Sequence, residues 1–127
     1  MRKIVLFFVA VLMLSACQQT LEERAAREAQ VYTDKNCPAQ LGEYLVMDSM
    51  TFDVQTHTFC YDYRFMGLMD TTAHDTEEMY RQLHDALKNT TTLKVYKDAG
   101  YNFRYVYRSQ KHPDTIIFEA TFGKEDY

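Results

Sequence analysis

The stretches TFCYDYR (residues 58–64) and NFRYVYR (residues 102–108) decide the fold of this chain, because both alternate large aromatic with other side chains. A period of two is typical of a β-strand with one buried face. Both stretches read x-F-x-Y-x-Y-R, and they begin 44 residues apart. Duplication of a helix–strand–strand unit would produce this repetition, and so would two independent strands that use the same aromatic residues.

Each aromatic strand has a neighbouring segment with the same period. Residues 44–54 place apolar side chains at alternating positions before the turn Gln55-Thr56-His57, and residues 116–122 do so after the turn at 110–114. Two runs of alternating residues joined by a short polar turn predict a β-hairpin. The sequence therefore predicts two hairpins, 44–65 and 101–122.

Two segments have helical signals. Thr20-x-x-Glu23 is a capping box that opens a helix ending at Asn36-Cys37-Pro38. Asp75-x-x-Glu78 opens a second helix, whose apolar stripe consists of Met79, Leu83, Ala86 and Leu87. A short helical turn is expected before Gly100, and residues 67–74 are expected to form a loop.

These elements predict an α+β fold with the order α-β-β-α-β-β. Two hairpins of half-apolar strands form a four-stranded antiparallel sheet, and the helices cover its apolar face. Residues 21–127 are long enough for a single domain with a modest core.

The N-terminus carries the pattern of a secretory signal. Arg2 and Lys3 precede an uncharged apolar run, Ile4–Leu14, which at about 1.5 Å per residue covers only half of a bilayer core. Residues 14–17, Leu-Ser-Ala-Cys, resemble the bacterial lipobox at every position. That resemblance implies removal of residues 1–16, a lipid thioether on Cys17, acylation of the new N-terminus, for example with palmitate, and a short tether at 17–20. The alternative is an ordinary signal peptide with an incidental cysteine.

The resemblance also implies a location. The residue after Cys17 is Gln18 rather than Asp, which favours the outer membrane by similarity to the sorting rule of Gram-negative lipoproteins. The domain is then lipid-anchored in the bacterial cell envelope, in the periplasm or at the cell surface. Without residues 1–16 the chain has 12 basic and 18 acidic residues, which disfavours nucleic acid and anionic membranes as partners.

Two cysteines remain beside the lipidation site. In an oxidising compartment Cys37 and Cys60 are expected to form a disulfide, which would close a loop of about 24 residues. Two unpaired buried thiols are the alternative.

The sequence offers little for catalysis, and an enzyme, such as a small hydrolase, is the less favoured interpretation. It has no nucleophile motif, no glycine-rich phosphate loop and no cysteine or histidine spacing typical of zinc, so we expect no cofactor and no metal. His57 and His112 lie in the two predicted hairpin turns. They would approach each other only if both turns lay at the same end of the sheet.

The favoured function is a non-enzymatic accessory lipoprotein that binds an envelope protein, and the alternative is a lipoprotein that binds a small ligand or glycan. Tyrosine and arginine are typical of interface hot spots. The candidate binding surface therefore contains Tyr61, Tyr63, Tyr105, Tyr107, Arg104 and Arg108. If the tyrosines instead pack under the helices, the opposite face, with Arg104, Val106, Arg108, Ile117 and Glu119, is the better candidate.

Overall fold

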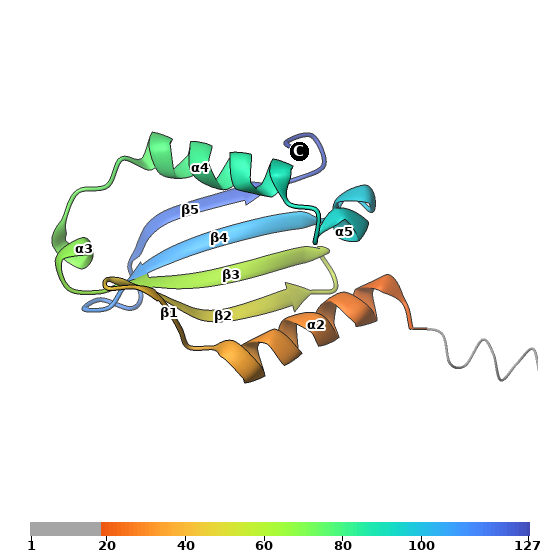
Figure 1. Cartoon of the computed structure of the whole chain (residues 1–127), viewed down its shortest axis with the longest axis horizontal. Coiled ribbons are helices and arrows are strands. Elements are labelled where there is room, and N and C mark those ends of the chain that lie inside the picture. Colours follow the sequence, from red (N-terminus) through yellow and green to blue (C-terminus); the bar gives the residue numbers. More distant parts are fainter. Residues whose placement is uncertain (1–18) are drawn as a thin grey trace, which may run out of the picture.

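The computed structural model describes residues 19–127 (Figure 1). The predicted signal peptide, residues 1–16, and Cys17 lie outside the described residues. The elements in chain order are α2 (Leu21–Asn36), β1 (Ala39–Gly42), β2 (Leu45–Asp53), β3 (Thr58–Phe65), α3 (Leu68–Thr71), α4 (Thr76–Asn89), α5 (Lys94–Asp98), β4 (Asn102–Ser109) and β5 (Ile116–Phe122). The fold is a mixed α+β fold.

The helix-start signals are confirmed. The Thr20 hydroxyl accepts a hydrogen bond from the backbone N–H of Glu23, and the Glu23 carboxylate accepts one from the N–H of Thr20. The Asp75 carboxylate caps α4 by accepting from the N–H of Glu78. Both residues satisfy backbone donors that have no partner inside the helix.

The predicted four-stranded antiparallel sheet is wrong. The sheet has five strands in the order β1-β2-β3-β4-β5, and β3 pairs with β4 in parallel, whereas the other pairs are antiparallel. The reason is the connection between β3 and β4, which passes through α3, α4 and α5. This crossover returns the chain to the end of the sheet where β3 began, so β4 runs in the same direction.

Two short elements add to the predicted order. β1 is an edge strand of four residues that pairs with β2, and α3 is a single helical turn within the expected loop. A bulge between Met47 and Ser49 also interrupts the period of two in β2. As a result, Val46 and Met50 lie on opposite faces of the sheet, although the sequence pattern places them on one face.

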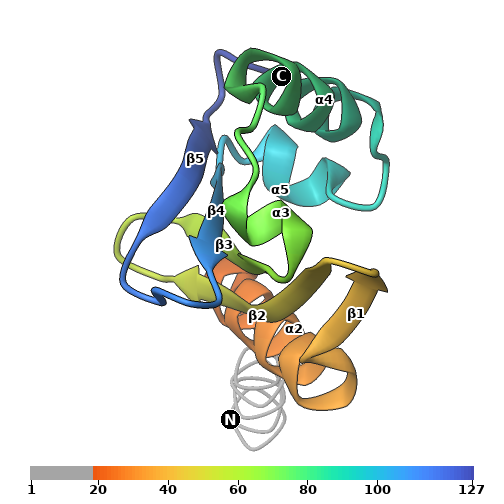
Figure 2. The ribbon, with the colours of Figure 1, turned by 90° about the vertical axis from the view of Figure 1, so that its left-hand side faces the viewer.

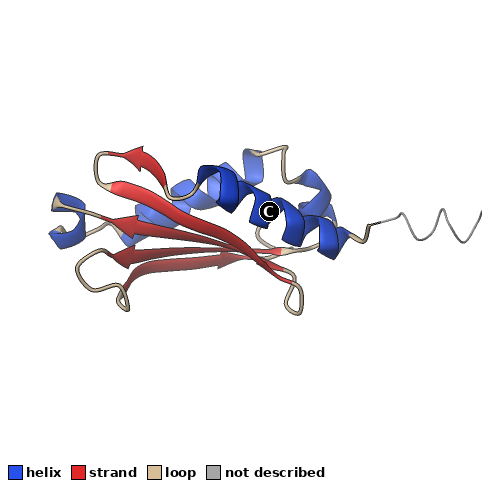
Figure 3. Cartoon of the chain, turned by 90° about the horizontal axis from the view of Figure 1, so that it is seen from below, coloured by secondary structure: helices blue, strands red, loops and turns tan. Residues whose placement is uncertain are grey.

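The helices of residues 19–127 all cover one face of the sheet, and within these residues the other face has no helix on it (Figures 2 and 3). Figure 2 shows α2 and α4 on the two flanks of the covered face, with α3 and α5 between them. The core lies between the sheet and this helix layer. It is built from rows of side chains that run across paired strands.

The first of these rows contains four phenylalanines, one from each long strand: Phe52, Phe59, Phe103 and Phe122. Phe103 and Phe122 are completely buried, and the rings of Phe59 and Phe103 stack with centroids 5.7 Å apart. Tyr96 of α5 packs edge-on against Phe59 from above. The Tyr96 hydroxyl donates a hydrogen bond of 2.5 Å to Glu28, which joins α5 to α2.

Helix α2 protects the outer edge of the sheet where β1 stops. The Thr33 hydroxyl donates to the carbonyl of Met50 (2.7 Å) and accepts from the N–H of the same residue (3.0 Å). These two hydrogen bonds satisfy backbone groups of β2 at a position that has no strand neighbour on that side.

The predicted disulfide is wrong, because Cys37 and Cys60 are both free thiols. Cys37 follows α2 directly and packs against the core on the covered face. Cys60 alternates with Phe59 and Tyr61 along β3, so its side chain points to the opposite face, where the thiol lies 3.7 Å from Asp62. Because the sheet separates the two sulfur atoms, they cannot bond in this fold.

Candidate functional site

The six residues predicted as one binding surface lie on two faces of the sheet. In the register of β3 and β4, Tyr61 pairs with Tyr105 and Tyr63 with Tyr107, all facing the helices. Arg104 and Arg108 alternate with these tyrosines and therefore face the uncovered side. The alternative in which the tyrosines pack under the helices thus describes the structure, and tyrosine and arginine do not form one patch.

The four tyrosines form two stacked pairs across the parallel strands. The ring centroids are 4.9 Å apart in the Tyr61–Tyr105 pair and 4.6 Å apart in the Tyr63–Tyr107 pair. Within residues 19–127 none of the four hydroxyls has a hydrogen-bond partner, and none is fully shielded from solvent. The rings thus contribute to the core, and the hydroxyls reach its rim between α2 and α4.

Burial changes the acidity of these phenols. It raises the pKa of Tyr105 and of Tyr107 to about 12, and it also raises the pKa of Tyr61 and of Tyr63. The cause is the loss of hydration around the phenolate, with a smaller contribution from neighbouring tyrosines for Tyr61, Tyr63 and Tyr105.

We expect the protein to lose stability as the pH rises from about 10 to about 12. Below the pKa of an unfolded tyrosine, the phenols are neutral in both states and the fold keeps its full stability. Above it, the unfolded chain ionises first, and stability falls until the folded pKa is passed. The ring NMR signals of Tyr61, Tyr63, Tyr105 and Tyr107 and the circular dichroism, followed together against pH, should change in one cooperative step. Ionisation of these four phenols near pH 10 while the circular dichroism stays constant would contradict this prediction.

The uncovered face carries charged side chains that are already paired. Arg104 lies 2.7 Å from Glu119, Arg108 lies 3.6 Å from Asp62, and Arg64 binds Asp48 at 3.1 Å. The hydrogen bond that Arg104 donates to the Glu119 carboxylate raises the pKa of Arg104. A ligand of this face would have to compete with these pairs, which weakens the case for the two arginines as binding residues.

The covered face has an apolar groove that the sequence did not reveal. It has a volume of about 300 Å³ and is open to solvent. Its walls come from β2, β3, β4, α3, α4 and the segment before α4, and it is lined by Leu45, Phe65, Met69, His74, Met79, Gln82, Leu83 and Tyr107. In Figure 1, α3 and the start of α4 lie at the end of the molecule opposite the start of α2.

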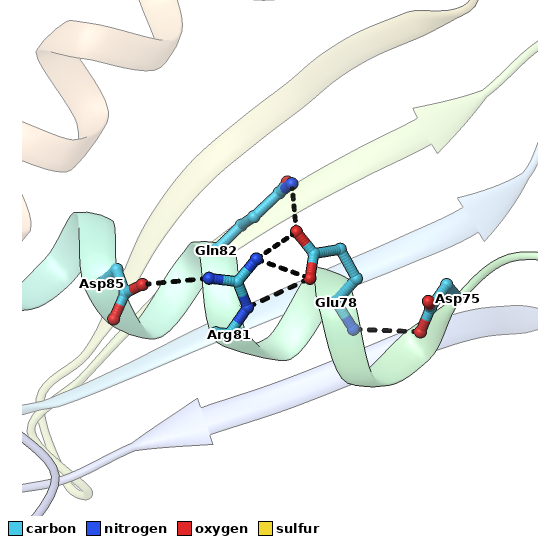
Figure 4. A network of polar contacts seen from close by, with 5 residues as sticks. All are labelled: Asp75, Glu78, Arg81, Gln82 and Asp85. Atoms are coloured by element: carbon cyan, nitrogen blue, oxygen red, sulfur yellow. Dashed lines mark hydrogen bonds and ion pairs between the residues drawn. The ribbon is translucent and has the colours of Figure 1, made fainter.

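Helix α4 turns the apolar residues Met79 and Leu83 toward this groove, because the side chains on its opposite side are polar. Figure 4 shows that Arg81 binds Glu78 on one side and lies 3.9 Å from Asp85 on the other. Gln82 donates to Glu78 at 3.0 Å. This network keeps one flank of α4 in water and directs Met79 and Leu83 toward the sheet.

The histidines of the two turns do not form a site. His57 precedes β3, whereas His112 follows β4, so the parallel pairing of these strands puts the two residues at opposite ends of the sheet. His57 stacks on Tyr101 and lies 3.4 Å from Glu22. In the part of the chain that the structure describes, no three His, Cys, Asp or Glu side chains are placed to hold a metal ion.

Two family models match this chain. The one described as a domain of unknown function, DUF8479, matches residues 20–118. The chain belongs to the DUF8479 family. The second, described as a prokaryotic membrane lipoprotein lipid attachment site, matches residues 1–18 of this DUF8479 protein and confirms the lipobox resemblance. The DUF8479 protein is therefore a lipid-anchored lipoprotein of the bacterial cell envelope.

No curated protein matches the DUF8479 protein in sequence. Solved structures with a similar fold include the Pseudomonas aeruginosa protein PA3611, at 10% identity and a TM-score of 0.66, with 86% of this chain and 98% of that chain covered. EpsS, the pilotin of the Vibrio vulnificus type 2 secretion system, has 17% identity, a TM-score of 0.66 and coverage of 84% and 90%. AspS, a type II secretion system pilotin of Vibrio cholerae, has 17% identity, a TM-score of 0.63 and coverage of 90% and 98%.

Among residues 19–127 of the DUF8479 protein, no helix is both long and apolar enough to cross a membrane.

Proposed function

We propose that this protein is an accessory lipoprotein of the outer membrane that binds an envelope protein through the apolar groove and catalyses no reaction. Residues 17–20 would join the lipid to the domain of residues 21–127. The observation that carries the proposal is the groove itself, an open apolar surface at the end of the domain opposite the start of α2. This position leaves the groove free to meet a partner away from the bilayer.

The lining of the groove suits the side chains of a protein segment. Met69, Met79 and Leu83 are only partly buried, so an apolar partner would remove further apolar surface from water. Methionine is flexible and polarisable and adapts to irregular partners. Leu68, which precedes Met69 in α3, is 65% exposed and adds apolar surface to this helix. A volume of about 300 Å³ with an open mouth is at the lower limit for a small-molecule site, which favours protein binding.

The similar structures support the same role. EpsS and AspS are pilotins of type II secretion systems, and both share this fold along most of their length. We infer that the present protein likewise serves an envelope assembly by binding one of its components. Gln18 after the lipidated cysteine supports the outer membrane as its location.

The test is site-specific photo-crosslinking in cells of the full-length protein. A photoreactive phenylalanine analogue at Gln82, which lines the groove and is exposed, is expected to capture a discrete envelope protein. The same residue at Thr121, exposed on the uncovered face, is the matched control and is expected to capture none. Leu83→Asp should reduce the crosslink from position 82 by at least about tenfold, since a buried carboxylate opposes apolar contact.

Two results would overturn the proposal. One is the absence of any protein adduct from position 82 when the anchored protein is present at normal amounts. The other is an adduct that persists in the Leu83→Asp variant, provided that its circular dichroism and melting temperature show an intact fold. Adducts only with glycan or small molecules would favour the alternative of a ligand-binding lipoprotein.

A further inference from the structure

A second hollow, here called the lysine hollow, lies at the other end of the domain. It has a volume of about 500 Å³, opens to solvent, and lies between the end of α4, α5 and the C-terminal segment. Its walls include Lys88, Lys94, Lys97 and Lys124, together with the Asp98 carboxylate and Tyr127, the last residue of the sequence. The mature chain contains six lysines, so most of them line this one hollow. Lys88, Lys94 and Lys97 are close together in the sequence, and the fold adds Lys124 from a distant segment.

Two of the four ammonium groups are available to a ligand. Lys97 is fixed in the wall, since its Nζ donates to the carbonyls of Leu87 (2.8 Å) and Thr90 (2.7 Å) at the end of α4. Lys94 is paired with Asp98 at 2.7 Å. Lys88 and Lys124 are exposed, and neither has an ion pair within residues 19–127.

In the described part of the chain, the carboxylates of Glu125 and Asp126 on the C-terminal segment do not form ion pairs with the lysines of the hollow. Asp126 uses its carboxylate to accept a hydrogen bond from the N–H of Gly123 (2.8 Å), which fixes the turn that carries Lys124. Glu125 is exposed and does not line the hollow. The hollow therefore has an excess of positive charge in a chain whose mature form is acidic.

The lysine hollow lies at the end of the domain that is tied to the lipid. Figures 1 and 3 show the start of α2, α5 and the end of α4 at the same end of the molecule. Contacts agree with this view, because Tyr96 of α5 binds Glu28 of α2 and His57 lies beside Glu22. Cys17 is four residues before Leu21, a distance of at most about 14 Å in extended chain.

We propose that the lysine hollow binds the phosphate of an anionic phospholipid in the bilayer that holds the anchor. An ammonium group binds phosphate as a compact point charge, and Lys88 and Lys124 offer two such groups without an ion pair at this hollow. The acidic remainder of the domain is repelled by an anionic surface, which favours the same orientation. The domain then stands on the membrane with its apolar groove turned away from it.

The experiment is amine labelling of the full-length lipidated protein in vesicles. One preparation contains phosphatidylcholine alone, and the other contains phosphatidylcholine mixed with phosphatidylglycerol. Mass spectrometry gives the acylation rate at each lysine. We expect the rates at Lys88 and Lys124, and at Lys94 beside them in the same hollow, to be about fivefold lower in the vesicles with phosphatidylglycerol. Lys111, in the turn before β5 at the far end, is the internal control and should react equally in both.

A matched pair of variants tests the role of the hollow. In Lys88→Gln/Lys124→Gln, the dependence of labelling at Lys94 on phosphatidylglycerol should disappear, whereas Lys35→Gln/Lys111→Gln should retain it. Equal labelling of Lys88 and Lys124 in the two kinds of vesicle would overturn the proposal. So would protection by inorganic phosphate on phosphatidylcholine vesicles that matches the protection by phosphatidylglycerol, because the hollow would then be a site for soluble phosphate.

Discussion

A Cys17→Ser protein is expected to carry no lipid and to keep residues 1–16. The thioether forms on the cysteine sulfur, so a hydroxyl at this position removes the attachment atom. The lipobox resemblance implies that the same cysteine marks the cut after Ala16, so we expect this cut to be lost as well. Two or three acyl chains hold a protein durably at a bilayer, at about 0.8 kcal/mol for each buried methylene, and the substitution removes all of them. Intact-mass measurement of the membrane-extracted protein should show the loss of the diacylglycerol and acyl groups together with the retained signal peptide.

Cys37→Ser is the control for this experiment. Cys37 is a free thiol at the end of α2 and lies outside the lipobox, so its substitution should leave the lipid mass and the processing site unchanged. Lipid retained on the Cys17→Ser protein would contradict the assignment of Cys17 as the anchor.

Phe103→Ala is expected to destabilise the fold by about 3–5 kcal/mol, because it removes a fully buried ring and leaves a cavity in the centre of the sheet. Phe103 lies on β4 in the row of four phenylalanines, where it stacks on Phe59 and contacts Tyr127 edge-on. A loss of this size is a large part of the total stability of a small domain, about 5–15 kcal/mol.

Urea unfolding followed by circular dichroism measures the change in the free energy of unfolding. Val54→Ala is the matched control, since Val54 is 51% exposed and should shift that free energy by less than about 0.5 kcal/mol. A loss below about 1 kcal/mol for Phe103→Ala would contradict the assignment of the phenylalanine row as the core.

Local signals in the sequence predicted the elements well because each signal acts within a few residues. The capping residues Thr20 and Asp75 satisfy backbone groups three positions away, and the alternation in 58–64 and 102–108 follows from the pleat of a single strand. These patterns contain no information on which strands become neighbours. A strand that pairs in parallel and one that pairs in antiparallel show the same alternation, so the β3–β4 pairing was not predictable from them.

The sites depend on contacts between distant segments. Alternation indicates that Tyr105 and Arg104 point to opposite faces of the sheet. It does not indicate which of the two faces the helices α2 and α4 cover. The apolar groove combines Leu45, Met69 and Leu83 from three elements, and the lysine hollow combines Lys88 with Lys124. The predicted Cys37–Cys60 disulfide is wrong for the same reason. It rested on an oxidising compartment and on the presence of two remaining cysteines, whereas the fold places the sheet between the two thiols.

The reciprocal hydrogen bonds between Thr33 and Met50 have a mechanical consequence. A lipid anchor transmits any pull on the domain through the start of α2, so this helix bears the load before the sheet does. The load passes to β2 through the Thr33–Met50 pair and to α5 through the contact of Glu28 with Tyr96. Neither of these two contacts of α2 involves β3, β4 or β5, so the load reaches these strands only through β2 or α5. A partner in the groove, held mainly by α4 and the inner strands, would therefore contact elements other than the helix through which this load enters the domain.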